Sequence, residues 1–248
     1  MKPRRIEILG VPVDCVDMPA ALRRLDDILV EGGRAAVIAV NPEKVVRAHQ
    51  DKRLLATLAG AGLLIPDGVG IVLAARILGL GPISRVAGAD LMPELCGHAA
   101  RSGRKVFLYG ARPEVTRRLA GILPARYPGL RLVGAAHGFL KKDEMPALVD
   151  QINASGADIL FVALGSPRQE RWIEEYLPLL KVKICQGVGG TFDILAGDVR
   201  RAPLVFRRLS IEWLYRLLAQ PSRLFRQTAL PIFAWAVVKK RFGGRGAL

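Results

Sequence analysis

Cysteine and histidine are scarce in this chain of 248 residues, which has three of each. The cysteines stand far apart, at Cys15, Cys96 and Cys185, so they form neither a disulfide framework nor a metal-ligand pair. Their number suits a reducing compartment, and we expect small, buried apolar residues at these positions. The histidines show no HExxH or other metal-ligand spacing. The sequence therefore predicts no metal centre.

Long uninterrupted apolar runs are also absent, although 51% of the residues are hydrophobic. No window offers the roughly 18 consecutive apolar residues that a membrane-spanning helix requires. The basic N-terminus precedes an apolar stretch that Glu7, Gly10 and Pro12 interrupt, and we expect no secretion signal. A chain of this length and composition can bury a sizeable core, in one domain or in one domain with an appendage.

The common nucleotide-binding patterns are missing too. No segment matches GxGxxG or GxxxxGK[ST], which argues against a nucleotide-dependent oxidoreductase and against a P-loop protein. There is no Asp-x-Asp pair to hold Mg²⁺ or Mn²⁺. Transfer from a nucleoside diphosphate builds negative charge on the leaving diphosphate, and metal ions, cationic side chains or helix N-termini can stabilise it. Arginine is the predicted counter-charge in this chain.

Acidic residues are too few to balance the basic ones, since 37 Lys and Arg face 22 Asp and Glu, for a net charge of +15. Residues 200–248 hold eleven basic residues, one acidic residue and seven of the fifteen aromatic residues. This mixture indicates a partner that is both anionic and apolar, such as a membrane surface. A nucleic-acid-binding protein is the rival interpretation, which the clustering of apolar residues with the charge disfavours.

A ten-residue apolar run at residues 229–238 precedes three basic residues within that segment. Such a run is too short to span a membrane but suits an interfacial helix, whose aromatic residues sit at headgroup level while its cations meet anionic lipid. A core helix with a solvated basic end is the alternative.

Apolar runs of strand length alternate with helical patterns over most of the chain. This alternation favours an α/β fold with a mostly parallel sheet covered by helices on both faces. The predicted strands are 6–9, 35–40, 63–65, 105–109, 130–135, 158–164 and 182–186. The predicted helices are 17–30, 43–59 with a break near Asp51, 68–78, 89–100, 113–126, 142–154 and 167–180. No strand is expected after Asp198, so we predict a catalytic body at 1–197 and a helical appendage at 198–248.

Asp67 follows one predicted strand and precedes a predicted helix. A carboxylate at the carboxyl end of a parallel strand lies where open α/β sheets bind ligands. Asp67 could accept a proton from an attacking hydroxyl, which requires a raised pKa or late proton transfer because a free Asp has a pKa of about 3.9. Alternatively it caps the helix that starts at Gly68. Asn41, at the end of the neighbouring strand, could bind the same substrate or only close a turn.

Three turns between predicted strands and helices are rich in glycine, around Gly110, Gly165 and Gly189. Glycine lets a phosphate approach the backbone N–H groups at the start of a helix. Beside Gly165, Gln169 would add a polar contact to such a ligand. The structural alternative for this turn is a capping box in which Ser166 is the cap and Gln169 its partner.

Six segments, in order along nearly the whole chain, resemble the WecG/TagA/CpsF glycosyltransferases, glycosyltransferase family 26. They are Asn-Pro-Glu at 41–43, Pro-Asp-Gly-Val-Gly at 66–70, Arg-Val-Ala-Gly-Ala-Asp at 85–90, Gly-Ser-Pro-Arg-Gln-Glu at 165–170, Gly-Val-Gly-Gly-Thr-Phe-Asp at 187–193, and Arg-Ala-Pro through Glu-Trp-Leu-Tyr-Arg at 201–216. Some members of the family carry threonine two residues before the asparagine, where this chain has Ala39.

The resemblance implies a Rossmann-like body and a peripheral membrane enzyme at the cytoplasmic face of the bacterial inner membrane. Such an enzyme moves a sugar from a UDP-sugar onto a polyprenyl-diphosphate-linked sugar, with inversion, in exopolysaccharide or cell-wall polymer synthesis. It requires no metal or cofactor and has no nucleic-acid partner, while a homo-oligomer is left open.

The resemblance also assigns roles to individual residues. Asp67 becomes the expected base, with Asn41 and Arg85 beside it. Gln169 and Asp193 are expected to line the nucleotide pocket, together with the glycine turns. The appendage is expected to supply the cations that complete the site and neutralise the diphosphate, namely Arg216, Arg223 and Arg226.

Overall fold

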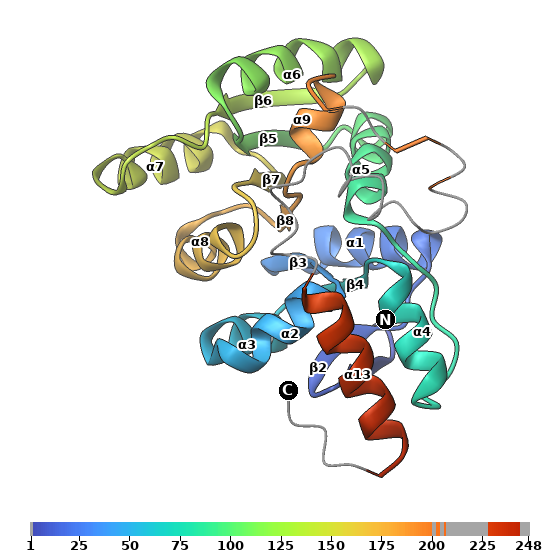
Figure 1. The fold of residues 1–248 in the computed structure, drawn as a ribbon. Helices are drawn as coiled ribbons and strands as arrows, with labels where there is room; N and C mark the ends of the chain where they lie inside the picture. The colour runs from blue at the N-terminus through green and yellow to red at the C-terminus, as the bar shows by residue number, and fades with distance from the viewer. Residues whose placement is uncertain (1, 200–201, 204–205, 207–227, 244–248) are drawn as a thin grey trace.

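The computed structural model describes residues 2–199, 202–203, 206 and 228–243. Its centre is a six-stranded parallel sheet with the spatial order β4-β3-β8-β7-β5-β6 (Figure 1). The strands of this sheet are β3 (Ala35–Val40), β4 (Leu63–Pro66), β5 (Lys105–Gly110), β6 (Arg131–Ala136), β7 (Ile159–Ala163) and β8 (Ile184–Gly187). The predicted α/β fold with a parallel sheet is confirmed.

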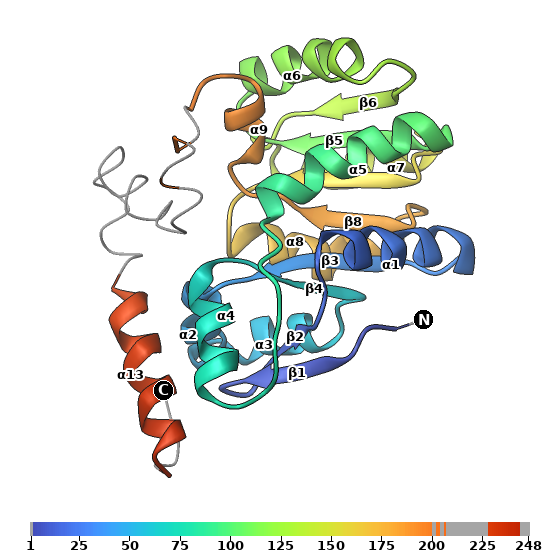
Figure 2. The same ribbon diagram turned by 90° about the vertical axis from the view of Figure 1, so that its right-hand side faces the viewer.

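Helices cover both faces of this sheet, as predicted (Figure 2). The helices that share a core with one face are α1 (Met18–Glu31), α5 (Gly88–Ser102), α6 (Pro113–Arg126) and α9 (Thr191–Leu195). Those that share a core with the other face are α2 (Pro42–Gln50), α3 (Lys52–Ala59), α4 (Val69–Ile77), α7 (Met145–Ser155), α8 (Arg168–Tyr176) and α13 (Ala229–Arg241).

Strand β7 shows how the sequence specifies this arrangement. All five of its residues are buried. Ile159 and Phe161 belong to one core and Leu160 and Val162 to the other, because successive side chains of a strand point to opposite faces. A strand buried on both faces must be apolar throughout, which explains the unbroken apolar run in the sequence.

The predicted strand at residues 6–9 exists as β1 (Arg5–Ile8), but it lies outside the central sheet. It pairs antiparallel with β2 (Val11–Asp14), a strand that the sequence analysis missed. Leu9 and Gly10 connect the two strands with φ angles of 50° and 78°, the left-handed values that tight hairpins favour.

The buried carboxylate of Asp14 ties this hairpin to the body. It accepts hydrogen bonds from Arg5 Nε at 2.7 Å and from the backbone N–H of Leu64, in β4, at 2.8 Å. The partner in β4 is distant in sequence, so local patterns could not reveal where the hairpin would dock.

One predicted helix is broken in its middle, and two others have a short 3₁₀ turn at one end. The break near Asp51 is confirmed, because its Oδ1 accepts the backbone N–H of Leu54 at 3.0 Å and starts α3. The other two predicted helices include short 3₁₀ turns, η1 (Lys142–Glu144) before α7 and η2 (Leu177–Leu179) after α8. Such turns are frequent at helix ends.

Cys96 and Cys185 are fully buried and Cys15 is half-buried, and all three are free thiols. Burial raises the pKa of the Cys96 thiol to about 12, so it stays protonated near neutral pH. The prediction of small apolar residues is therefore confirmed for the two buried cysteines.

Helix α13 has a buried side, as the core-helix alternative for residues 229–238 requires, while its attachment to a membrane stays a prediction. Ala229, Phe233, Ala236 and Val237 are buried and recur at helical spacing along one side. The residues exposed on the helix include Ile232, Val238 and Trp235, whose exposed fraction is 70%. One side of the helix therefore completes the core while another faces outward. The domain boundary near Gly197 stays a prediction.

A glycine in α4 makes room for this helix. A Cβ atom added at Gly70 would lie 2.7 Å from Cγ of Pro42, in α2, and 3.9 Å from Cε1 of Phe233. Helices α2, α4 and α13 therefore meet at one closely packed point. Within the ranges that the structure describes, no helix has the length and apolar character needed to cross a membrane.

We predict that Phe233→Ala lowers the free energy of unfolding by about 3 kcal/mol, because it removes a buried ring and leaves a cavity. Trp235→Ala, on the exposed side of the same helix, should change it by less than about 0.5 kcal/mol. Urea unfolding of both variants measures the difference. Equal effects of the two substitutions would contradict the packing of α13 on the body.

Candidate functional site

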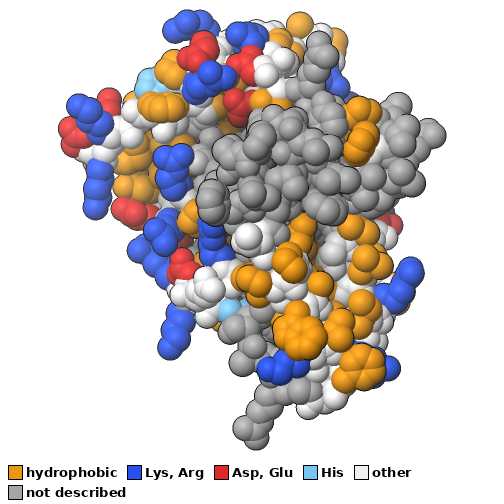
Figure 3. Space-filling model, in the orientation of Figure 1, with side chains coloured by type: hydrophobic (Ala, Val, Ile, Leu, Met, Phe, Trp, Pro, Cys, Tyr) orange, Lys and Arg blue, Asp and Glu red, His pale blue; other side chains and the backbone are white. Residues whose placement is uncertain are grey.

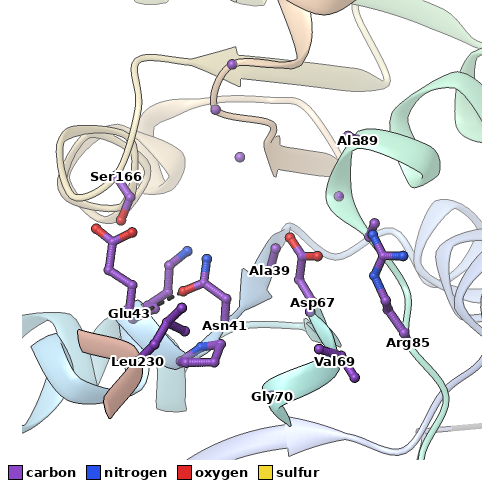
Figure 4. A pocket seen from close by; sticks show the side chains of 18 of the residues that line it. Ala39, Asn41, Glu43, Asp67, Val69, Gly70, Arg85, Ala89, Ser166 and Leu230 are labelled. Carbon is purple, nitrogen blue, oxygen red and sulfur yellow. Dashed lines mark hydrogen bonds between the residues drawn. The ribbon is translucent and has the colours of Figure 1, made fainter. Parts of the chain in front are cut away.

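A cavity of about 790 Å³ opens at the carboxyl ends of the central strands (Figure 4). Because all strands of the sheet run parallel, the turns that follow β3, β4, β7 and β8 meet at this edge. Of the eight predicted site residues within the described ranges, seven line the cavity. They are Asn41, Asp67, Arg85, Gly165, Gln169, Gly189 and Asp193.

The eighth residue, Gly110, does not line this cavity. It is buried at the end of β5 with a φ of 126°, and an added Cβ would lie 2.5 Å from the carbonyl oxygen of Ala163. Because glycine has no side chain, β5 can pack closely against β7 at this position. The role of Gly110 in the site stays a prediction. The other three predicted residues, Arg216, Arg223 and Arg226, lie outside the described residues.

Asp67 continues the chain from β4, where its N–H donates to the carbonyl of Val40 at 2.8 Å. It is half-buried and its carboxyl group points into the cavity (Figure 4). The N-cap residue of α4 is Gly68, with φ 90° and ψ 147°, a conformation that only glycine adopts readily. The alternative in which Asp67 is the N-cap residue is therefore wrong.

Asn41 both closes a turn and faces the cavity. Its Oδ1 accepts the backbone N–H of Lys44 at 2.8 Å, so the side chain caps α2. The Nδ2 group is then the part of the amide that points into the cavity (Figure 4). The side chain thus offers a fixed hydrogen-bond donor to a sugar hydroxyl or a phosphate oxygen.

Arg85 reaches the cavity from the segment that connects α4 to α5. The N–H of the next residue, Val86, donates to the carbonyl of Pro66 at 2.8 Å and holds this segment against the end of β4. The guanidinium of Arg85 and the carboxyl of Asp67 both extend into the cavity from this edge (Figure 4). A cation and a carboxylate thus line the same edge of the cavity.

Gln169 lines the cavity, but its side chain does not form the hydrogen bonds of a capping box. The Ser166–Pro167 peptide is cis and α8 begins at Arg168. Instead of forming the capping box, the amide of Gln169 donates through Nε2 to Oε1 of Glu170 at 2.9 Å and accepts the N–H of Gly189 at 2.9 Å. The capping-box alternative is therefore wrong, and Gln169 connects α8 to the turn after β8.

Two further residues at the site, Lys44 and Glu170, were not expected from the sequence, although Lys44 lines the cavity. Lys44 and Glu170 are both buried, and Nζ of Lys44 donates to Oε1 of Glu170 at 2.7 Å. Burial raises the pKa of Glu170, but the Lys44 ammonium and the hydrogen bonds from Lys44, Gln169 and Ser166 outweigh burial and hold that pKa below its ordinary value. Lys44 lies four residues from buried Ala48, so its place on the buried side of α2 was the available signal.

Asp193 contributes a carboxylate from α9 at the far side of the cavity. Its Oδ1 lies 4.0 Å from Nη2 of Arg112. Arg112 also donates to Asp198 at 2.9 Å, and Arg118 forms a second ion pair with Asp198. These contacts tie the residues after α9 to α6 and hold Asp193 at the cavity wall.

One wall of the cavity is apolar. It is built by two helices from distant parts of the sequence, and the residues concerned are Leu73, Ala74 and Ile77 of α4 with Leu230, Phe233, Ala234, Val237 and Val238 of α13. On the molecular surface, hydrophobic side chains gather over these two helices, next to basic residues (Figure 3). The cavity is thus polar at the strand ends and apolar toward α13.

The Glycosyl transferase WecG/TagA/CpsF family model matches residues 6–247. The chain belongs to this family. The resemblance inferred from the six sequence segments is confirmed, and the protein is a glycosyltransferase.

Two similar proteins both have the name N-acetylglucosaminyldiphosphoundecaprenol N-acetyl-beta-D-mannosaminyltransferase. The one from Bacillus spizizenii is 37% identical over 205 residues, which cover 83% of this chain and 79% of the relative. The one from Bacillus subtilis is 35% identical over 206 residues, which cover 83% of this chain and 80% of the relative.

The WecG/TagA/CpsF glycosyltransferase described here has no group of three or more His, Cys, Asp or Glu side chains placed to hold a metal ion, within the part of the chain that the structure describes. That its reaction requires no metal stays a prediction.

We predict that Gly187→Ala disturbs the site through Gln169. The added Cβ would lie 2.9 Å from Nε2 and 3.1 Å from Cδ of Gln169, whose amide is held in place by its two hydrogen bonds. Such overpacking costs about 1–3 kcal/mol, measurable by urea unfolding. Gly33→Ala is the control, because nothing lies within 4 Å of its Cβ position. A stable Gly187→Ala protein would show that Gln169 is free to move.

Proposed function

We propose that this glycosyltransferase moves a sugar from a UDP-sugar onto a polyprenyl-diphosphate-linked sugar and inverts the anomeric centre. The proposal rests on one observation, a cavity that is polar in one part and apolar in another. Its strand-end part offers hydrogen-bond donors, a cation and a carboxylate, as a nucleotide sugar requires, and its α4–α13 wall offers the apolar surface that a polyprenyl chain requires. The Bacillus relatives are named for a diphosphoundecaprenol acceptor, which supports the same class of acceptor here.

Asp67 is the base in this proposal. An acceptor hydroxyl oxygen attacks the anomeric carbon of the donor, a new C–O bond forms, and the hydroxyl proton passes to the carboxylate of Asp67. The bond between the anomeric carbon and the diphosphate oxygen breaks on the opposite side, and UDP leaves with the electron pair. Attack from the side opposite the leaving group inverts the anomeric centre.

The surroundings of Asp67 fit the two substrates. In Figure 4, Asp67 lies between Asn41 and Arg85 along one edge of the cavity, and Ser166 lies on the other side of Asn41. The nucleotide half of the donor then occupies the glycine turns near Gln169 and Asp193, and the lipid-linked acceptor enters along the apolar wall. Arg85 faces the developing charge of the diphosphate, joined in this proposal by Arg216, Arg223 and Arg226.

The proposed place of action is the cytoplasmic face of the bacterial inner membrane. On α13, exposed Trp235 and Ile232 precede the basic residues 239–241. Apolar side chains that enter the headgroup region and cations that meet anionic lipid are the features of interfacial helices. An attachment at α13 would bring the apolar wall of the cavity to the lipid carrier.

A direct assay of sugar transfer identifies the donor. The Bacillus relatives are named as N-acetylmannosaminyl transferases, and this chain has Ala39 at the cavity where some family members carry threonine. UDP-N-acetylmannosamine, its uronic acid and UDP-glucose should each be incubated with a polyprenyl-diphosphate-linked N-acetylglucosamine acceptor. Transfer from one of them supports the proposal, and failure of every UDP-sugar would refute it.

We predict that Asp67→Asn lowers kcat by about 10²-fold or more, the usual contribution of a general base, while the thermal shift produced by UDP is retained. Asp143→Asn, which changes an exposed carboxylate outside the cavity, should leave kcat unchanged. Turnover is measured with the donor identified above. Near-normal turnover of Asp67→Asn would exclude Asp67 as the base.

We predict that neutralising Lys239, Lys240 and Arg241 together, by substitution with glutamine, weakens binding to anionic vesicles by about 100-fold. Each cation near an anionic surface contributes about 1 kcal/mol, and about 1.4 kcal/mol corresponds to a factor of ten. Vesicle sedimentation with anionic and neutral lipid measures the effect. The matched control neutralises three exposed basic residues away from α13, namely Arg131, Lys141 and Lys142. An equal loss in the control would indicate a nonspecific charge effect.

A further inference from the structure

The ion pair between Lys44 and Glu170 lies at the edge of the candidate site, where Lys44 lines the cavity and Glu170 is buried beside it. Their side chains are 5% and 1% exposed, and Nζ and Oε1 are 2.7 Å apart. The pair joins α2, which follows β3, to α8, which follows β7, although the two residues are 126 positions apart in the sequence. It therefore bridges two of the turns that form the cavity.

The charge of Glu170 determines how the amide of Gln169 is oriented. An ionised carboxylate only accepts hydrogen bonds, so Gln169 must present Nε2 to Glu170, at 2.9 Å. Its carbonyl oxygen is then directed to the N–H of Gly189, also at 2.9 Å. A reversed amide would set a donor against a donor at Gly189 and a carbonyl oxygen against the carboxylate. The orientation of one buried amide is thus transmitted to the turn after β8.

Lys44 acts on a second site residue through its backbone. Its N–H donates to Oδ1 of Asn41 at 2.8 Å, which leaves the amino group of Asn41 facing the cavity. The backbone and the side chain of one residue therefore hold Asn41 on one side of the cavity and, through Glu170, the Gln169–Gly189 contact on the other.

Stability alone does not account for this pair. Removing two charges from water costs several kcal/mol per ion, and apolar residues of similar volume are often as stabilising as a buried ion pair or more so. An apolar pair cannot supply the directional hydrogen bonds that fix neighbouring polar groups.

We propose that Lys44 and Glu170 are positioning residues that act through Gln169, holding the Gly189 turn in the form that binds the nucleotide half of the donor. This role rests on the proposed function, since it takes UDP as the leaving group. Neither residue needs to touch the reacting atoms.

The test replaces the pair by apolar residues, in the double variant Lys44→Met/Glu170→Leu. We expect the dissociation constant for UDP, measured by calorimetry on the full chain, to rise about tenfold, the loss of roughly one oriented hydrogen bond. The KM for the donor should rise in parallel while kcat changes little, because binding rather than chemistry is affected. If this variant does not fold, Glu170→Gln preserves the shape, removes the charge and should give the same tenfold rise.

A double-mutant cycle separates positioning from general structural support. Gln169→Met removes the amide and leaves the ion pair, and it should also weaken UDP binding about tenfold. If the pair acts through Gln169, changing both together gives about tenfold again, rather than the roughly hundredfold of independent effects. The control is Arg53→Met/Glu174→Leu, which removes a more exposed 2.7 Å ion pair between α3 and α8 and should leave UDP affinity unchanged.

The possible outcomes distinguish this inference from the proposed function. UDP affinity that is unchanged in the folded variants, or additive losses in the cycle, would overturn the positioning role while leaving the UDP-dependent reaction in place. Absence of UDP binding by the wild-type chain would overturn the proposed donor, and the positioning role with it.

Discussion

Burial of both faces of the parallel sheet is the constraint on which the rest of this structure depends. Apolar side chains fill most of both faces, so the polar side chains of the site lie at the strand ends and at the starts of the helices that follow them. Because the strands are parallel, the turns after β3, β4, β7 and β8 meet at one edge. Asn41, Asp67, Gln169 and Asp193 therefore reach one cavity although long stretches of sequence separate them.

Polar groups at that edge hold one another in place through hydrogen bonds. Asn41 is held by the backbone of Lys44, Lys44 by Glu170, and Gln169 by Glu170 and Gly189. These hydrogen bonds link Asn41, Lys44, Glu170, Gln169 and Gly189 into one network that limits how each side chain can turn. A site organised in this way needs little reorganisation when a ligand binds.

Helix α13 adds the apolar half of the cavity. Its buried side packs against α2 and α4, with Phe233 near Gly70, and the same helix contributes the wall that includes Val237 and Val238. The helix is thus part of the core and part of the site at once. In this member of the WecG/TagA/CpsF family, the wall is the surface that the proposed lipid-linked acceptor would contact.

The sequence by itself determined the six strands of the parallel sheet, the helices that cover it, the family and the strand-end location of Asp67, because local periodicity and short motifs carry this information. The β1–β2 hairpin, the Lys44–Glu170 pair, the orientation of Gln169 and the packing of α13 on Gly70 were decided only by the tertiary structure. Each of these depends on contacts between residues far apart in the chain. Such contacts leave no periodic pattern, since only the folded sheet brings their partners within hydrogen-bonding or van der Waals distance.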